Sequence, residues 1–159
     1  MRKIISIRLV SVVDTDPDFS WIGEYTSSPG PDDRTIDRQE RGDCGRGEYR
    51  YFVAAMSGKE TGNPESVEQD YARMEDYNRQ GWCFVGIQAI AEVQMTKNGP
   101  IQKVRSGGLW GIESDSGDAH FQEVGKDEMH DLTSELKAMG FTDKQIKAAM
   151  PESLEVESV

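Results

Sequence analysis

The sequence has little cysteine and little histidine, with two of each in 159 residues. Two cysteines exclude a disulfide-dense scaffold and an all-cysteine zinc site. No run of apolar residues approaches the roughly 18 that a membrane-spanning helix needs, so no membrane segment is expected. The basic and apolar start resembles a secretory signal only briefly, because Arg8 interrupts it and aspartates follow at positions 14, 16 and 18. We therefore expect a cytoplasmic protein with reduced thiols.

Recognisable catalytic motifs are missing as well. The chain has no Walker phosphate-binding loop and no nucleophile elbow of the Gly-x-Ser-x-Gly type. His120 and His130 lie near acidic residues, but their spacing matches no zinc signature. Cys83 falls on the apolar side of a predicted strand, where a thiol behaves as an inert core residue. We assign no catalytic residue, no metal ligand and no cofactor, and the sequence favours a non-enzymatic protein.

Basic residues are scarce relative to acidic ones. Eighteen Lys and Arg against 29 Asp and Glu give a net charge of −11. This balance disfavours direct binding to nucleic acid or to an anionic membrane, because both are themselves negatively charged. The acidic excess is uneven, since residues 113–159 hold 12 acids and 4 lysines, a net of −8. A field of this kind would attract a basic partner.

Apolar periodicity predicts a sheet of about five strands. Alternating apolar residues, or apolar runs bounded by turn residues, predict strands at residues 3–13, 21–25, 49–56, 82–95 and 101–112. Gly107-Gly108 is expected to break or bulge the last of these. The segment 49–56 carries apolar residues on both faces, which is typical of a central strand. The charge-dense segment 32–50 is expected to be irregular.

Helical signals lie between two of these strands and after the last one. A helix with Asn63 or Ser66 as N-cap is expected to end at Gly81. One or two helices are expected after residue 118, broken at Gly125. A capping box of Thr142 and Gln145 then predicts a short helix ending at Met150. The order predicts an α+β fold, an antiparallel sheet with one inserted helix and a C-terminal helical segment packed on it. We expect a single domain over residues 1–151 and an acidic, flexible tail over 152–159.

Acidic residues recur at helical spacing near the C-terminus. The predicted partner-binding face consists of Glu123, Asp127, Glu128, Asp131 and Glu135. Four residues rise about 6 Å along a helix, whereas one DNA strand carries a charge about every 3.4 Å, so Asp127, Asp131 and Glu135 alone are too sparse to mimic DNA. Glu123, Glu128 and the tail acids would have to fill the gaps. An ordinary solvated helix face is the simpler interpretation of the same pattern.

Arginine is concentrated in one glycine-rich segment. Five of the ten arginines lie within residues 34–50, together with three glycines. Arginine forks suit phosphate and carboxylate, and glycine lets backbone N–H groups approach an anion. An alternative anion-binding site for a nucleotide or a nucleic-acid end would use Arg38, Arg41, Arg46, Arg50, Arg105 and Trp110. The segment 32–50 also carries six acids, so a loop that neutralises itself through ion pairs is the simpler interpretation.

Four stretches of the chain resemble a family of small acidic proteins of phages, prophages and related mobile elements. They are RQERGDCGRGEYRYF at 38–52, DYARME at 70–75, WCFVGI at 82–87 and RSGGLWGIESDS at 105–116. The likeness spans roughly residues 3–141. The family has no assigned activity, so no functional residue carries over. The resemblance implies a mobile-element protein that acts on or inside a bacterial host.

Three hypotheses about function follow. The first is a non-enzymatic protein that binds a basic surface of a host protein, such as a nucleic-acid-handling or defence factor, through its acidic face, as an inhibitor or DNA mimic does. The second is an anion-recognition module or small enzyme built on the arginine segment. The third is a structural or assembly protein, for example a homodimer formed through an exposed sheet edge.

Overall fold

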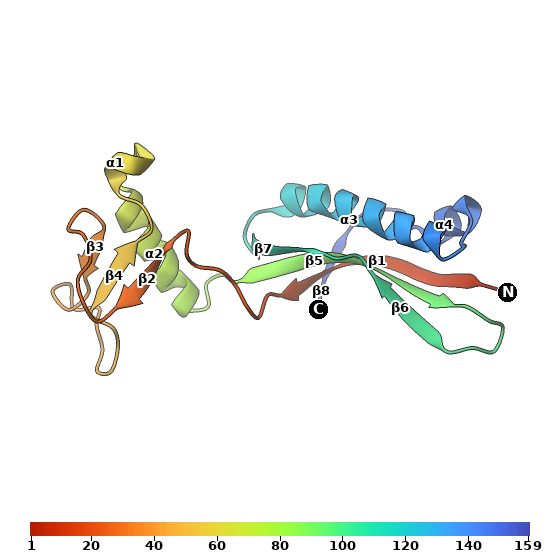
Figure 1. Ribbon diagram of the computed structural model, residues 1–159, viewed down its shortest axis with the longest axis horizontal. Coiled ribbons are helices and arrows are strands. Elements are labelled where there is room, and N and C mark those ends of the chain that lie inside the picture. The colour runs from red at the N-terminus through yellow and green to blue at the C-terminus, as the bar shows by residue number, and fades with distance from the viewer. The chain divides into compact units, whose positions relative to one another are not determined.

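The computed structural model describes residues 1–159, and the chain divides into two compact units (Figure 1). Unit 1 comprises residues 1–15 and 83–159, and unit 2 comprises residues 16–82. The α+β class predicted from the sequence is confirmed. The single domain expected over residues 1–151 is instead two units, because residues 16–82 build a sheet and a core of their own.

Unit 1 is built on a five-stranded mixed sheet. Its two long strands, β1 (Lys3–Val13) and β5 (Phe84–Gln94), pair antiparallel. β6 (Ile101–Arg105) and β7 (Leu109–Glu113) both pair with β5, and the bend between them falls at the predicted Gly107-Gly108 break. β8 (Val156–Ser158) runs parallel to β1 on its other side. The segment expected to be a flexible tail thus contains a strand, since its backbone pairs with residues 9–11 of β1.

Two helices cover one face of this sheet, and the core lies beneath them (Figure 1). They are α3 (Asp118–Ala138) and α4 (Asp143–Ala149). The break expected at Gly125 does not occur. Gly125 is buried in the middle of α3, where a Cβ atom would lie 2.6 Å from Leu9 Cδ1, so the glycine serves close packing. The predicted capping box of Thr142 and Gln145 begins α4.

Unit 2 is a three-stranded antiparallel sheet with two helices, α1 (Gly58–Thr61) and α2 (Ser66–Asn78). β4 (Tyr51–Ala54) is the central strand, as its two apolar faces predict, between β2 (Gly23–Thr26) and β3 (Thr35–Asp37). β3 lies in the segment expected to be irregular, and it forms because buried Ile36 pairs with Phe52. The N-cap of α2 is Glu65 rather than the predicted Asn63 or Ser66, and its side chain makes no capping hydrogen bond, while the Ser66 hydroxyl accepts a hydrogen bond from Thr61.

No helix of the structure is both long enough and apolar enough to cross a lipid bilayer.

Candidate functional site

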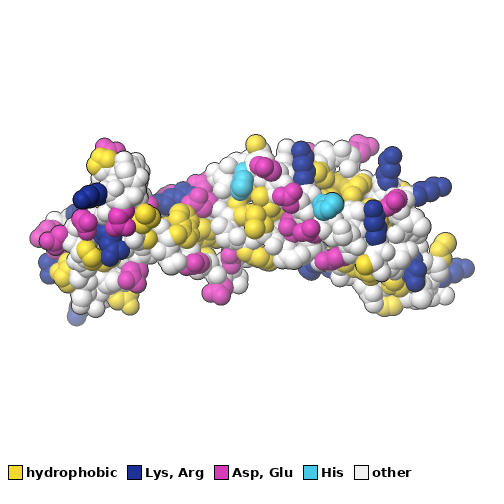
Figure 2. All heavy atoms as spheres, turned by 45° about the horizontal axis from the view of Figure 1, so that its top comes forward, with side chains coloured by type: hydrophobic (Ala, Val, Ile, Leu, Met, Phe, Trp, Pro, Cys, Tyr) yellow, Lys and Arg dark blue, Asp and Glu magenta, His cyan; other side chains and the backbone are white.

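The candidate site is the solvent side of α3. Glu123, Asp127, Asp131 and Glu135 are exposed there and follow one another at four-residue spacing. We call these four residues the α3 acidic face. The opposite side of the helix carries the buried Met129, Leu132 and Leu136, which join the core of unit 1. Figure 2 shows acidic side chains along this helix beside the two histidines. The core contacts fix which side of α3 faces the solvent.

The four carboxylates of this face have no basic partner within the protein. No ion pair joins any of them to a lysine or arginine, and Lys137 on the same helix pairs instead with Asp143, 3.0 Å away. Neighbouring carboxylates at four-residue spacing repel one another and destabilise a helix by a few tenths of a kcal/mol per pair. The α3 acidic face is therefore a row of uncompensated negative charge on a well-anchored element.

Glu128, the fifth residue predicted for this face, lies elsewhere. It is 6% exposed, and its Oε1 accepts hydrogen bonds from the Ser106 hydroxyl and the Gly108 N–H, both at 2.7 Å. The prediction is corrected at this residue: Glu128 fastens the β6–β7 bend to α3. It shares the inward side of the helix with Val124 and Leu132 at four-residue spacing, a signal already present in the sequence. Glu128 therefore does not fill the gaps between the exposed carboxylates as a DNA mimic would require.

The negative charge is distributed differently in space than along the sequence. Unit 2 holds 15 acidic and 8 basic residues, a net of −7, whereas unit 1 holds 14 and 10, a net of −4. The strand-forming parts of unit 1, residues 1–15 and 83–112, contain 6 basic and 2 acidic residues. The C-terminal excess therefore does not make unit 1 the more acidic unit. Within unit 1, acidic residues predominate in the part that contains the helices, and basic residues predominate in the part that contains most of the strands.

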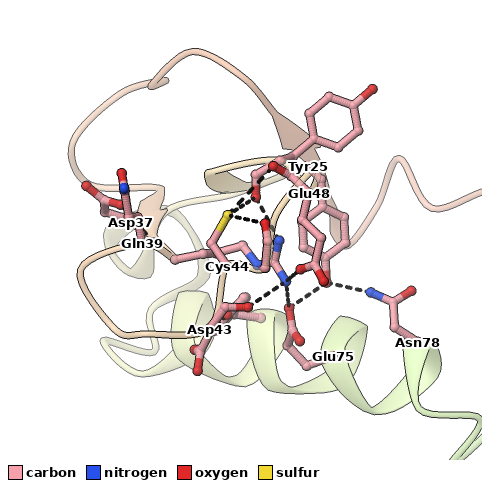
Figure 3. A network of polar contacts seen from close by, with 12 residues as sticks. Tyr25, Asp37, Gln39, Asp43, Cys44, Glu48, Glu75 and Asn78 are labelled. Atoms are coloured by element: carbon pink, nitrogen blue, oxygen red, sulfur yellow. Dashed lines mark hydrogen bonds and ion pairs between the residues drawn. The ribbon is translucent and has the colours of Figure 1, made fainter.

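Polar contacts surround Arg38 in the arginine segment. Figure 3 shows the surrounding network, with Asp43, Glu48 and Glu75 labelled. Arg38 is 5% exposed, and its guanidinium donates to the Tyr49 carbonyl at 2.7 Å. Glu48 and Glu75 lie 3.0 and 3.1 Å from its Nη2, and the Tyr25 ring stacks over it. Removing an unpaired charge from water is costly, and the two carboxylates offset that cost here. Arg38 is thereby engaged in holding unit 2 together.

Two further arginines of the segment form two-pronged ion pairs. Arg41 binds Glu68, and Arg50 binds Asp37 with its Nε at 3.1 Å and its Nη2 at 2.8 Å. Hydrogen bonds from these arginines hold the pKa of Glu68 and the pKa of Asp37 below their ordinary values. Arg46 makes no such pair. Arg50 and Arg38 have partners within the segment, Asp37 and Glu48, as the self-neutralising interpretation expects, whereas Glu68 and Glu75, which pair with Arg41 and Arg38, belong to α2. Of the six residues of the alternative site, Arg105 and Trp110 belong to unit 1 and the other four to unit 2.

Two tyrosines complete this network, of which Tyr71 is buried and Tyr25 is partly buried. The Tyr71 hydroxyl donates to Asp43 at 2.8 Å, and the Tyr25 hydroxyl donates to Glu75 at 3.0 Å while accepting from Asn78. Burial, helped by Asp43, raises the pKa of Tyr71 to about 12, and burial beside Glu75 raises the pKa of Tyr25 further above its ordinary value. An open depression of about 460 Å³ lies beside these groups, lined by Tyr25, Arg38, Asp43, Glu48, Tyr49, Glu75, Asn78 and Arg79.

No protein-family model matches the chain, and searches of curated proteins and of solved structures give no match either.

Proposed function

We propose that this chain is a non-enzymatic binding protein whose α3 acidic face docks onto a basic surface of another protein. The observation that carries the proposal is the row of four exposed carboxylates without an internal partner. Three of the arginines in unit 2, by contrast, are matched with carboxylates of the same unit. Charge that is not neutralised inside the protein is available to a partner, and complementary charge raises the rate of encounter and fixes orientation.

The anchoring of α3 supports the same proposal. Leu132 and Leu136 are fully buried against the sheet, so the face is held on a rigid element before a partner arrives. A preformed surface loses less conformational entropy on binding than a flexible acidic tail does. Successive residues of the face are about 6 Å apart along the helix axis, which suits separate contacts with several lysines or arginines. The resemblance to phage and mobile-element proteins favours a bacterial host protein as the partner, in the cytoplasm.

A charge-matched pair of variants tests the proposal. E123Q/D127N/D131N/E135Q removes the α3 acidic face, and D32N/D33N/E40Q/E65Q removes four exposed charges from unit 2, so both change the net charge equally. The wild type and the control variant are expected to bind a deca-lysine peptide with shifts of the α3 amide resonances. The face variant is expected to lose those shifts. Equal α3 shifts in all three proteins would contradict the proposal.

Affinity capture from a bacterial lysate then tests the partner class. Some proteins should be retained by the wild type and the control but not by the face variant, and not when the salt is raised to about 0.5 M. These proteins are expected to carry basic surfaces. Salt has this effect because exposed charges are screened over distances beyond about 10 Å already at 0.1 M. Retention that ignores both the variant and the salt would point to an interface elsewhere on the molecule.

A further inference from the structure

The five-stranded sheet of unit 1 has a second face that carries no helix of that unit (Figure 1). On β5, Ala89 and Ala91 belong to the core under the helices, so the alternate residues Gln88, Ile90 and Glu92 point to the other side. The register places Arg8 of β1 and Arg105 of β6 on either side of Ile90. Ile90 is only 3% exposed, and the aliphatic stems of neighbouring arginines are able to cover an apolar residue in this position. We call this surface the helix-free face.

Trp110 lies flat on the same face. A Cβ atom at Gly86 of β5 would come within 2.2 Å of Trp110 Cε3, so the ring rests directly on the strand backbone at that glycine. The indole N–H donates to the Gly107 carbonyl at 3.2 Å, and Glu128 holds the adjacent bend from the other side of the sheet. Trp110 is still 44% exposed. One side of the ring is therefore packed and the other is open to solvent.

The basic residues of this face have no carboxylate partners. No ion pair forms at Arg8, Lys103 or Arg105, and the Nε of Arg8 is shielded from water without any hydrogen-bond acceptor. The Nε of Arg38 also lacks an acceptor, but the guanidinium of Arg38 is matched by two glutamates. The register places seven charged residues on the helix-free face: Lys3, Arg8, Lys103, Arg105, Glu92, Glu113 and Glu157. Its local balance is positive in a protein whose net charge is −11.

We propose that the helix-free face binds single-stranded nucleic acid, with a base stacked on Trp110 and phosphates at Arg8 and Arg105. A sheet face that combines an open aromatic ring with arginines is a recurrent way to hold unpaired bases. Gly86 and Ile90 are four residues apart on β5, or about 13 Å, which is more than a single nucleotide spans and calls for an oligonucleotide. Stacking on Trp110 requires an unpaired base, so duplexes are not ligands of this face. The proposal is independent of the α3 acidic face, which lies on the opposite side of the sheet.

Fluorescence anisotropy with labelled ten-residue oligothymidylate and oligouridylate, at low salt, tests the role of Trp110. Trp110→Ala is expected to raise the Kd of the bound oligonucleotide roughly 5- to 150-fold, the contribution of one base stacked on an aromatic side chain. The matched control is Trp21→Ala, which removes an exposed tryptophan from unit 2 and leaves the Kd unchanged. Circular dichroism of both variants reports whether they fold.

The salt dependence of binding gives a second readout that does not rely on the tryptophan variant. R8Q/R105Q is expected to reduce the slope of log K against log salt concentration by about 1.4, because each phosphate contact on a single strand contributes about 0.7. K144Q/K147Q, with the same loss of charge on α4, leaves the slope unchanged. Binding of neither oligonucleotide at millimolar concentration overturns the proposal, and so does binding that ignores both the Trp110 and the arginine variants. A deca-glutamate peptide that shifts the β5 and β6 amides when neither oligonucleotide does would show a protein-binding surface instead.

Discussion

Single side chains in unit 1 show how far burial changes the role of a charged residue. Glu128 and Asp127 are adjacent in sequence, yet Asp127 faces solvent and Glu128 accepts two hydrogen bonds inside the unit. The sequence shows both as acids on a helix. The difference follows from the 3.6-residue period, which places residue 128 with the apolar residues 124 and 132. The four-residue spacing of the acids identifies the exposed row. Only the spacing of the apolar residues shows that Glu128 lies on the buried side of the helix.

Replacing Glu128 with Ala is expected to lower the free energy of unfolding by roughly 2–4 kcal/mol, because the Ser106 hydroxyl and the Gly108 N–H each lose a buried acceptor. Urea unfolding followed by circular dichroism measures this change. Asp127→Ala is the control, with an expected effect within about 0.5 kcal/mol, as is usual at exposed positions. Equal effects of the two variants would show that the Glu128 hydrogen bonds add nothing to stability.

Buried Tyr71 of unit 2 gives a second residue-scale prediction. Since burial and Asp43 raise the pKa of Tyr71 to about 12 in the folded protein, the unfolded chain, with a pKa near 10, releases this proton first. The stabilising contribution of Tyr71 is then complete below about pH 10 and is lost as the pH rises towards 12. Phenolate absorbance at 295 nm is expected to show a late-titrating group that Tyr71→Phe removes, and Tyr49→Phe, at an exposed tyrosine, serves as the control.

Whole elements were predicted best where one signal acts alone. The strand at 3–13 agrees with the structure because apolar alternation defines it, and the segment 101–112 forms two strands because it is broken at the predicted Gly107-Gly108. The Thr142–Gln145 capping box places the start of α4. The expected break at Gly125 is wrong because intrinsic helix propensity is overridden by packing against Leu9. Rules based on neighbouring residues take no account of Leu9, which is distant in sequence.

α3 is expected to be more stable without its acidic face. E123Q/D127N/D131N/E135Q removes three repulsive carboxylate pairs at four-residue spacing, which should raise the free energy of unfolding by about 0.5–1.5 kcal/mol at low salt. Thermal unfolding measures the gain, and 1 M salt is expected to abolish most of it by screening. A variant that is less stable than the wild type at low salt would show that these carboxylates have stabilising contacts.

The organisation of the whole molecule is the feature that was predicted least well from the sequence. Composition and periodicity gave the α+β class, but they did not separate residues 16–82 from the rest, because the insertion contains strands and a helix of the same kinds as its surroundings. The candidate site shows the same limit. The α3 acidic face was predictable from a single helix, whereas the helix-free face depends on which strand pairs with which. Arg8 and Arg105 come together only through their common neighbour on β5.

Unit 2 is expected to respond to acid through its ion pairs. Arg50 lowers the pKa of Asp37, and Arg41 lowers the pKa of Glu68, so their contribution to stability is present above the unfolded pKa near 4 and is lost as the pH falls through the lower folded values. Amide hydrogen exchange between pH 6 and pH 3 should show unit 2 losing protection. The D37N/E68Q variant is expected to be less stable at pH 6 and to depend less on pH. A pH dependence identical to that of the wild type would contradict this role.

The chain leaves unit 1 after β1 and returns at β5, and the Asp14 N–H donates to the Phe84 carbonyl at 2.9 Å across those two connections. For unit 1, everything from residue 16 to residue 82 is thus one very long hairpin loop. Closing a flexible loop becomes more unfavourable only slowly with length, by about 0.6 kcal/mol for each doubling. If unit 2 folds first, much of the loop is already ordered when β1 and β5 pair, so less loop entropy remains to be lost. The pairing of β1 with β5 then becomes a nearly local contact. Folding of unit 2 before unit 1 would therefore make the pairing of β1 with β5 easier.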